Sequence, residues 1–163
     1  MTDLYIYNNN VSRIGAKALA TSLQYNSTLT KLYIFSNNIG SEGTKALATS
    51  LQYNSTLTIL YISNNNVSKI GAKALADYLK YNSTLTELNI YNNNIGSEGI
   101  KALATSLKYN STLTNLNIGW NNIIRDEGII ALTDALYNNF TLTWLYILES
   151  RINFNLIQKR RLL

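Results

Sequence analysis

The sequence repeats itself every 28 residues. The pattern Leu29-x-x-Leu32-x-Ile34-x-x-Asn37 recurs at this spacing from Leu57, Leu85 and Leu113. A unit of this length cannot bury an apolar face on its own, so neighbouring copies must stack to form one continuous core. The repetition therefore predicts an elongated solenoid that presents ordered rows of side chains to its surroundings.

Each unit contains two kinds of periodicity. In residues 32–35 aliphatic side chains alternate with others, which is the period-2 pattern of a short strand with one buried face. Ala46, Leu47, Ala48 and Leu51 instead follow helical spacing. We therefore expect one strand and one helix in every repeat.

The Leu-x-x-Leu-x-Ile-x-x-Asn segments, each followed by a glycine and an Ala-Leu helical run, resemble the leucine-rich repeat. Within that family they are most similar to the long ribonuclease-inhibitor-like class, which also occurs in NOD-like receptors. The resemblance implies an α/β fold, a right-handed leucine-rich repeat solenoid (horseshoe) with a parallel inner sheet and outer helices. We expect one domain over residues 1–163, made of repeats 1–28, 29–56, 57–84, 85–112 and 113–141 and a partial repeat with a C-terminal cap at 142–163.

Asparagine occupies two columns of the repeat. One column resembles the family's ladder, in which the side-chain amide satisfies backbone groups after each strand; it contains Asn9, Asn37, Asn65, Asn93 and Asn121. The other follows the helices, where we expect residues that tolerate left-handed backbone; it contains Asn26, Asn54, Asn82, Asn110 and Asn139.

The starts of the helices carry two further signals. Small polar residues are predicted to cap the helices, at Ser41, Ser97 and Asp126 and, one residue earlier in the repeat, at Ser12 and Ser68. Glycine is predicted to let each helix approach the strand layer, at Gly15, Gly43, Gly71, Gly99 and Gly128.

The composition argues against an enzyme. The 163 residues include no histidine and no cysteine, which excludes His-dependent triads, thiol nucleophiles and the usual zinc sites. The Gly-rich segment 40–45 lacks the spacing of a phosphate-binding loop. We therefore expect no catalytic residues, no metal, no cofactor and no small-molecule substrate.

The sequence also bears on location. No apolar run is long enough to span a bilayer, and no signal peptide precedes the first strand, so we expect a cytoplasmic protein. A secreted effector of an intracellular bacterium is compatible with the same features. Entry into a eukaryotic secretory pathway would instead invite glycosylation, because Asn-x-Ser/Thr sequons occur at Asn10, Asn26, Asn54, Asn66, Asn82, Asn110 and Asn139.

The strands predict a binding surface on their concave side. Side chains beside the buried leucine and isoleucine must point away from the core, and two columns there are rich in aromatic residues. One column reads Tyr5, Tyr33, Tyr61, Asn89, Asn117 and Tyr146, and the other reads Tyr7, Phe35, Ser63, Tyr91, Gly119 and Leu148. Trp120 and Trp144 extend the band towards the C-terminus. Exposed aromatics are typical of protein-binding surfaces, so we expect a protein or peptide partner here.

Other interpretations stay open at this point. The tyrosines could merely stack and stabilise the sheet, in a repeat scaffold with no dedicated ligand. The chain could be an enzyme regulator of the inhibitor or GTPase-activating type, for which Arg13 and Arg125 would be the basic residues. Lysines on the helix side could attract acidic partners or nucleic acid; they are Lys17, Lys45, Lys73, Lys80, Lys101 and Lys108. The unpaired N-terminal strand at 4–7 predicts self-association through that edge.

Overall fold

The computed structural model describes residues 2–122 and 124–147. The expected C-terminal cap, with Leu148 of the second aromatic column, lies outside the described residues, as does Ile123. The strands are β1 (Asp3–Tyr5), β2 (Lys31–Tyr33), β3 (Ile59–Tyr61), β4 (Glu87–Asn89), β5 (Asn115–Asn117) and β6 (Trp144–Tyr146). The helices are α1 (Arg13–Tyr25), α2 (Gly40–Leu51), α3 (Ser68–Tyr81), α4 (Gly96–Leu107) and α5 (Asp126–Asn138).

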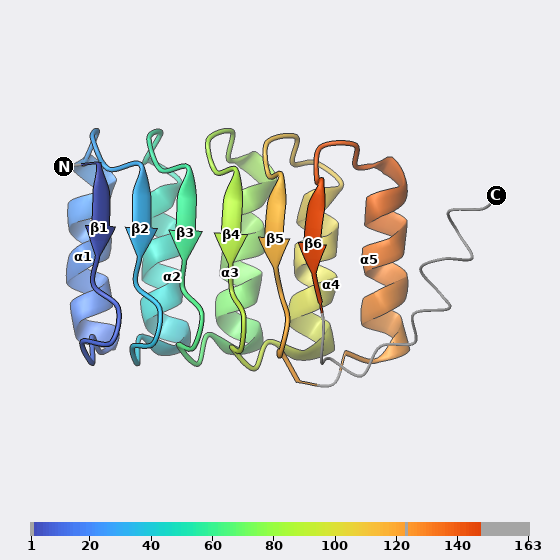
Figure 1. Cartoon of the computed structure of the whole chain (residues 1–163), viewed down its shortest axis with the longest axis horizontal. Helices are drawn as coiled ribbons and strands as arrows, with labels where there is room; N and C mark the ends of the chain where they lie inside the picture. The colour runs from blue at the N-terminus through green and yellow to red at the C-terminus, as the bar shows by residue number, and fades with distance from the viewer. Residues whose placement is uncertain (1, 123, 148–163) are drawn as a thin grey trace.

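The strands form one parallel sheet in chain order, and the helices lie in a second layer on one face of it (Figure 1). Each strand pairs with the next in the register of the repeat, so that Leu32 lies beside Leu4 on one side and Leu60 on the other. The expected α/β solenoid of parallel strands and outer helices is confirmed.

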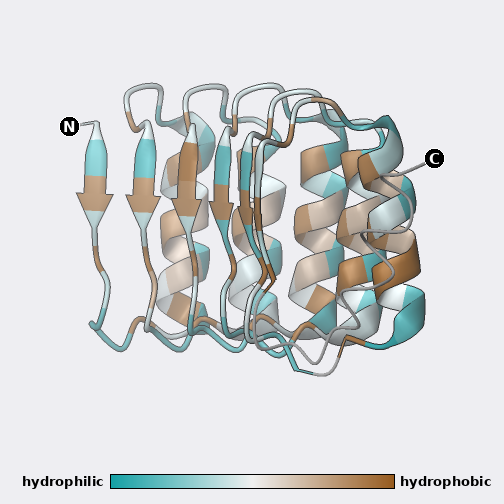
Figure 2. Ribbon diagram, turned by 45° about the vertical axis from the view of Figure 1, so that its right-hand side comes forward, coloured by the Kyte–Doolittle hydropathy of each residue, from teal (hydrophilic) through white to brown (hydrophobic). Residues whose placement is uncertain are grey.

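The core lies between the two layers. The central leucine of each strand and the isoleucine two residues later are buried from the second to the fifth repeat, as Leu60 and Ile62 illustrate with no exposed surface. Figure 2 shows the leucines as a hydrophobic band that crosses the strands at one level. Buried leucines and alanines of the helices, such as Leu75 and Ala72, close the core from the other side.

The helix-start glycines serve a different contact from the predicted one. A Cβ added at Gly43 would lie 2.8 Å from the Ala16 Cβ of the preceding helix, and one at Gly99 would lie 3.0 Å from the Ala72 Cβ. Both distances are below van der Waals contact. At Gly43 and Gly99 the missing side chain therefore lets neighbouring helices pack against each other, whereas the sequence suggested an approach of helix to strand layer. At Gly15, Gly71, Gly99 and Gly128 an added Cβ would come closest, at 2.6 to 2.9 Å, to the valine or isoleucine four residues earlier.

The predicted asparagine ladder after the strands is confirmed. The Asn65 side chain is fully buried and its Nδ2 donates to the carbonyl oxygens of Ile34 (2.9 Å), Ile62 (3.1 Å) and Ser63 (3.1 Å). Its Oδ1 accepts from the backbone N–H of Asn37 at 3.2 Å. One amide thus joins two repeats through groups that the buried turn cannot pair by itself.

The asparagines after the helices form a second ladder, and the prediction of left-handed backbone there is wrong. The backbone of Asn26, Asn82 and Asn139 is extended, with φ of −77°, −73° and −99°. Left-handed residues occur instead in the turns after the strands, for example Asn64 and Asn66 at φ 55°. The asparagine side chain explains the difference, because Asn110 Oδ1 accepts from the N–H of Thr112 and Leu113 while its Nδ2 donates to Leu79 and Asn82 carbonyls.

This second ladder also bears on the sequons. The Nδ2 atoms of Asn54, Asn110 and Asn139 donate to carbonyl oxygens of the preceding repeat at 2.7 to 3.0 Å. A glycan would have to be attached at that same nitrogen. Modification of these three asparagines is therefore incompatible with the folded repeat.

The predicted helix caps are only partly confirmed. The Ser12 hydroxyl accepts from the N–H of Ile14 at 3.2 Å, and the Ser68 hydroxyl accepts from that of Ile70 at 3.3 Å. Ser41, Ser97 and Asp126 cap nothing, because they are themselves helical residues: α2 begins at Gly40, α4 begins at Gly96, and α5 begins at Asp126. The Ser97 hydroxyl instead accepts from the N–H of Arg125, and so links two repeats.

Candidate functional site

The face of the sheet that points away from the helices, which we call the strand face, holds the predicted binding residues. Its side chains alternate with the buried leucines and isoleucines, so they point away from the helices. The register places Tyr5 beside Tyr33 and Tyr33 beside Tyr61, and it also aligns Asn89 with Asn117 and Asn117 with Tyr146. The strand spacing thus brings residues 28 apart in sequence into contact.

Five aromatic side chains gather over the first three strands, and we call them the N-terminal aromatic cluster: Tyr5, Tyr7, Tyr33, Phe35 and Tyr61. The Tyr5 and Tyr33 rings stack with centroids 4.6 Å apart, and so do the Tyr7 and Phe35 rings. Tyr33 meets Tyr61 edge to face at 5.1 Å. Tyr5 remains 57% exposed and Tyr7 43% exposed, so the cluster offers a wide ring surface to a partner.

The other predicted aromatics form two separate pairs. Tyr91 and Trp120 lie 6.2 Å apart in a tilted arrangement, and Trp144 stacks on Tyr146 at 5.9 Å. Both tryptophans are nearly half exposed. The structure therefore places all nine predicted residues on the strand face or at its rim, but it does not bring them together in one site.

A polar strip separates the aromatic groups, so the continuous band expected from sequence is interrupted. Asn89 and Asn117 occupy the tyrosine column on β4 and β5, and each side-chain oxygen accepts from the backbone N–H two residues later at 3.1 Å. Their side-chain NH2 groups make no hydrogen bond within residues 2–122 and 124–147. These groups can donate to a partner that crosses the strands.

Charged residues border the N-terminal aromatic cluster. Lys31 Nζ lies 3.3 Å from Asp3 Oδ2, and this hydrogen bond raises the pKa of Lys31. The Tyr61 hydroxyl donates to the Glu87 carboxylate. Burial, reinforced by Glu87, raises the pKa of Tyr61, and burial likewise raises that of Tyr33. Both hydroxyls therefore stay protonated at neutral pH.

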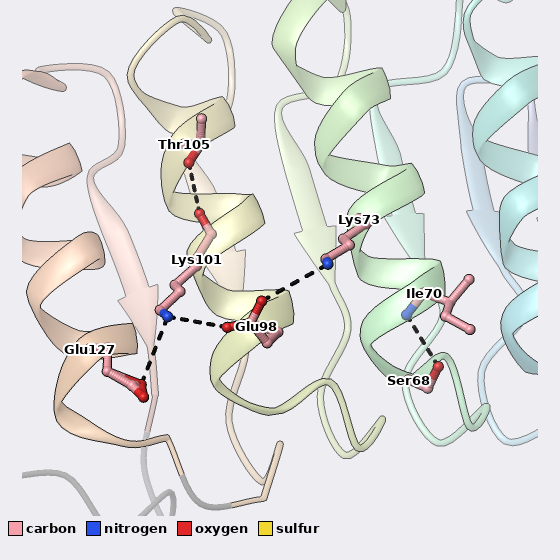
Figure 3. Close-up of polar contacts among 7 residues, drawn as sticks. All are labelled: Ser68, Ile70, Lys73, Glu98, Lys101, Thr105 and Glu127. Carbon is pink, nitrogen blue, oxygen red and sulfur yellow. Dashed lines mark hydrogen bonds and ion pairs between the residues drawn. The ribbon is translucent and has the colours of Figure 1, made fainter.

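The lysine column on the helix layer is partly neutralised. Lys101 Nζ lies 3.1 Å from Glu98 Oε1 and 3.9 Å from Glu127 Oε2, while Lys73 Nζ lies 3.9 Å from Glu98 Oε2 (Figure 3). The hydrogen bond from Lys101 lowers the pKa of Glu98. Glu98 and Glu127 thus pair with two of the six lysines, within one repeat and between neighbouring repeats, which weakens the case for a basic binding surface.

Other kinds of site find little support. Over the described ranges, no three His, Cys, Asp or Glu residues come together in a way that could hold a metal ion. A hollow of about 780 Å³ opens at the helix starts of the third to fifth repeats, between Lys69, Glu98 and Arg125. It mixes both signs of charge. None of the helices in the described part of the chain is long and apolar enough to cross a bilayer.

One row of aromatics was missed by the sequence reasoning. Exposed tyrosines stand at or beside the helix ends, at Tyr25, Tyr53, Tyr81, Tyr109 and Tyr137. Their 28-residue spacing was the available signal. Tyr78 was missed as well; it fills a position that is serine in the neighbouring repeats, at Ser50 and Ser106, and only 1% of it is exposed.

Parallel strands on one layer, helices on the other and an asparagine ladder at each edge define a solenoid of strand–helix repeats. The sequence profile of the family described as Leucine Rich repeat matches residues 25–48, 53–76, 81–104 and 109–132. These segments make up more than half of the chain, which belongs to the leucine-rich repeat family. The predicted resemblance to that family is confirmed.

Two solved structures share the fold. The actin-binding site 2 of leiomodin-1 matches with a TM-score of 0.73 and 24% sequence identity, over 90% of this chain and 92% of that one. The tropomodulin C-terminal domain of Caenorhabditis elegans matches with a TM-score of 0.72 and 17% identity, over 90% of this chain and 98% of that one. No curated protein sequence gives a significant match.

Proposed function

We propose that this chain is a protein-interaction module that binds a protein or peptide on its strand face. The observation that supports this most strongly is the N-terminal aromatic cluster, in which ring contacts fix five aromatic side chains while Tyr5 and Tyr7 stay exposed and the other three stay half-buried. Rigid aromatic side chains lose little conformational entropy on binding and are enriched among interface hot spots. The name of the leiomodin-1 domain, an actin-binding site, adds that a domain of this fold can engage a protein.

The polar strip extends the proposal to the shape of the ligand. A segment that crosses the strands would pack on the N-terminal aromatic cluster, receive hydrogen bonds from Asn89 and Asn117, and reach Trp144 and Tyr146. This surface needs no catalytic group.

We also propose that the module is cytoplasmic, because proteins of the cytoplasm rarely contain disulfides and this chain has none. Immunolocalisation that finds the protein outside cells would contradict that location.

Peptides selected from a random library against the whole chain supply a probe for this proposal. Replacing Tyr33 and Tyr61 together with alanine should weaken binding of these peptides by about 2 kcal/mol or more, since buried aromatic anchors dominate interface energies. Calorimetry measures the affinity, and thermal melting measures the loss of stability, which should be smaller. Stacking alone would contribute only about 0.2 to 1 kcal/mol per pair to the sheet and nothing to a ligand.

The matched control changes the helix layer. Lys45→Glu and Lys73→Glu should leave the affinity for these peptides unchanged. Loss of binding in the lysine variants, with the tyrosine variant unaffected, would move the binding surface to the helix layer.

We also propose self-association through the N-terminal edge. Among the strands of residues 2–122 and 124–147, β1 pairs only with β2, and a hollow of about 160 Å³ beside it is lined by Leu4, Leu19 and Leu23. Unpaired strand groups next to apolar side chains favour pairing with a second copy. Light scattering should show dimers at high concentration and monomers for Leu4→Lys. A wild-type chain that stays monomeric throughout would refute the proposal.

A further inference from the structure

A groove of about 410 Å³ opens at the edge where helices lead into strands, which is the upper edge in Figure 1. It lies between the second and third repeats, and Tyr53 and Tyr81 both line it. Tyr53 is 66% exposed and Tyr81 is 79% exposed. Gln52, Ser55 and Tyr78 also line the groove.

Tyr78 supplies an unused polar group in this groove. Its side chain is almost fully buried, and its hydroxyl makes no hydrogen bond within the described chain. Burial raises the pKa of Tyr78, and the nearby Thr84 side chain, which does not meet hydrogen-bond geometry with the hydroxyl, opposes this rise. The neutral hydroxyl can therefore accept or donate a hydrogen bond at any physiological pH.

The second asparagine ladder is interrupted at the same place. Asn54, Asn110 and Asn139 each donate to two carbonyls of the repeat before them. Asn82 donates instead to the hydroxyl of Thr84 in its own repeat, at 3.0 Å. The carbonyls of Leu51 and Asn54, both in residues that line the groove, thus lack the donor that the other interfaces supply.

The interface between the third and fourth repeats shows which kind of chemical group fits between two of the tyrosines at the helix ends. Lys80 Nζ lies 5.2 Å from the centroid of the Tyr81 ring and 4.9 Å from that of the Tyr109 ring, so one cation sits between two aromatic rings. The residue equivalent to Lys80 in the preceding repeat is Gln52, which carries no charge. The groove between Tyr53 and Tyr81 therefore has the aromatic walls but lacks the cation.

The surroundings favour a cation as well. The groove lies at the C-terminal end of α2, where the helix dipole and the last carbonyl groups attract positive charge. Arginine suits such a place better than lysine, because its planar guanidinium stacks on rings and offers five donors with no acceptor. We propose that this groove binds an arginine side chain from a basic peptide segment of a partner protein, with the guanidinium between Tyr53 and Tyr81.

The test uses the whole isotope-labelled chain and the peptide acetyl-Gly-Arg-Gly-amide. Amide chemical shifts should change saturably at residues 52–55 and 81–84, while those of the strand face stay unchanged. The same peptide with citrulline, which keeps the shape of arginine without its charge, should bind at least about tenfold more weakly. Equal binding of the two peptides, or shifts on the strand face alone, would overturn the assignment.

Two lysine variants form a matched pair. Gln52→Lys should fill the groove from within, as Lys80 fills the next one, and should lower the affinity for the arginine peptide by at least about tenfold. Thr105→Lys adds the same charge at an exposed position of α4, away from the groove, and should leave the affinity nearly unchanged. Equal effects of the two would show that only net charge matters.

Two further variants examine the walls and floor. Tyr81→Ala removes one exposed ring and should weaken binding without lowering the melting temperature much. Tyr78→Phe removes only the hydroxyl and should weaken binding by about two- to tenfold, the value of one hydrogen bond, with equal or higher stability. Unchanged affinity in Tyr78→Phe would show that the hydroxyl is not part of the site. If cellohexaose binds in this groove and the arginine peptide does not, the proposed ligand class is replaced with a glycan. None of these outcomes affects the proposal for the strand face, which rests on other residues.

Discussion

Replacement of Asn65 by leucine should lower the free energy of unfolding by about 3 to 5 kcal/mol. The substitution keeps the volume of the side chain but removes an amide that pairs with three carbonyl oxygens and one well-placed N–H group. Each buried polar group left unpaired costs about 1 to 3 kcal/mol, and some of these groups will relax towards other partners. Urea titration measures the loss, which corresponds to roughly 10 °C in the melting temperature.

Asn9→Leu is the control, because it makes the same chemical change at the exposed end of the ladder. Among the described residues, the Asn9 side chain donates only to the Tyr7 carbonyl of its own repeat, at 2.9 Å. We expect a loss below about 1 kcal/mol. A similar loss in both variants would mean that the amide acts within its own turn, and that the links between repeats contribute little.

Asn110→Leu should cost about 2 to 4 kcal/mol through the second ladder. It removes two hydrogen bonds to the carbonyls of the preceding repeat and two from N–H groups of its own turn. Thermal and urea unfolding of the variant measure this loss directly.

Asn82→Leu provides the comparison inside the same column. Asn82 accepts from the N–H groups of its own turn but sends its NH2 group to Thr84. Its replacement should therefore cost less than that of Asn110, by about 1 kcal/mol or more. Equal losses would show that the cross-repeat bonds of this ladder add no stability.

The fold could be predicted from the sequence because its signals repeat. Alternating residues such as Leu32 and Ile34, followed by a helical run with Leu47 and Leu51, occur in successive copies and are buried as expected. The function of Asn65 followed from resemblance, and its hydrogen bonds confirm it. The binding function of the strand-face aromatics stays a prediction that the variants at Tyr33 and Tyr61 can test.

The errors arose where one side chain had more than one way to satisfy a helix end. Asparagine favours left-handed backbone, but its amide can also bind backbone groups in an extended conformation, as Asn139 does. Serine at a helix start can cap that helix, as Ser12 does, or bind the neighbouring repeat, as Ser97 does. The choice depends on neighbours that only the folded stack supplies.

The importance of Tyr78 could not be read from its own repeat. A tyrosine in an amphipathic helix suggests core packing, and the ring is indeed buried. What matters is that its equivalents, Ser50 and Ser106, bond back to their own helices through the hydroxyl. The unpaired hydroxyl of Tyr78 and the Asn82 amide that turns to Thr84 could be found only in the folded stack.

Within the described part of the chain, each helix packs closely among the helices only on its neighbours, and each strand pairs among the strands only with the strands next to it. Tyr78 and the displaced amide of Asn82 therefore alter one interface while the interfaces on either side keep their asparagine bonds. A chain built in this way can change its surface one interface at a time without repacking the rest. Diversity in what such a protein recognises can then accumulate as separate local edits, each limited in cost to the two repeats that share it.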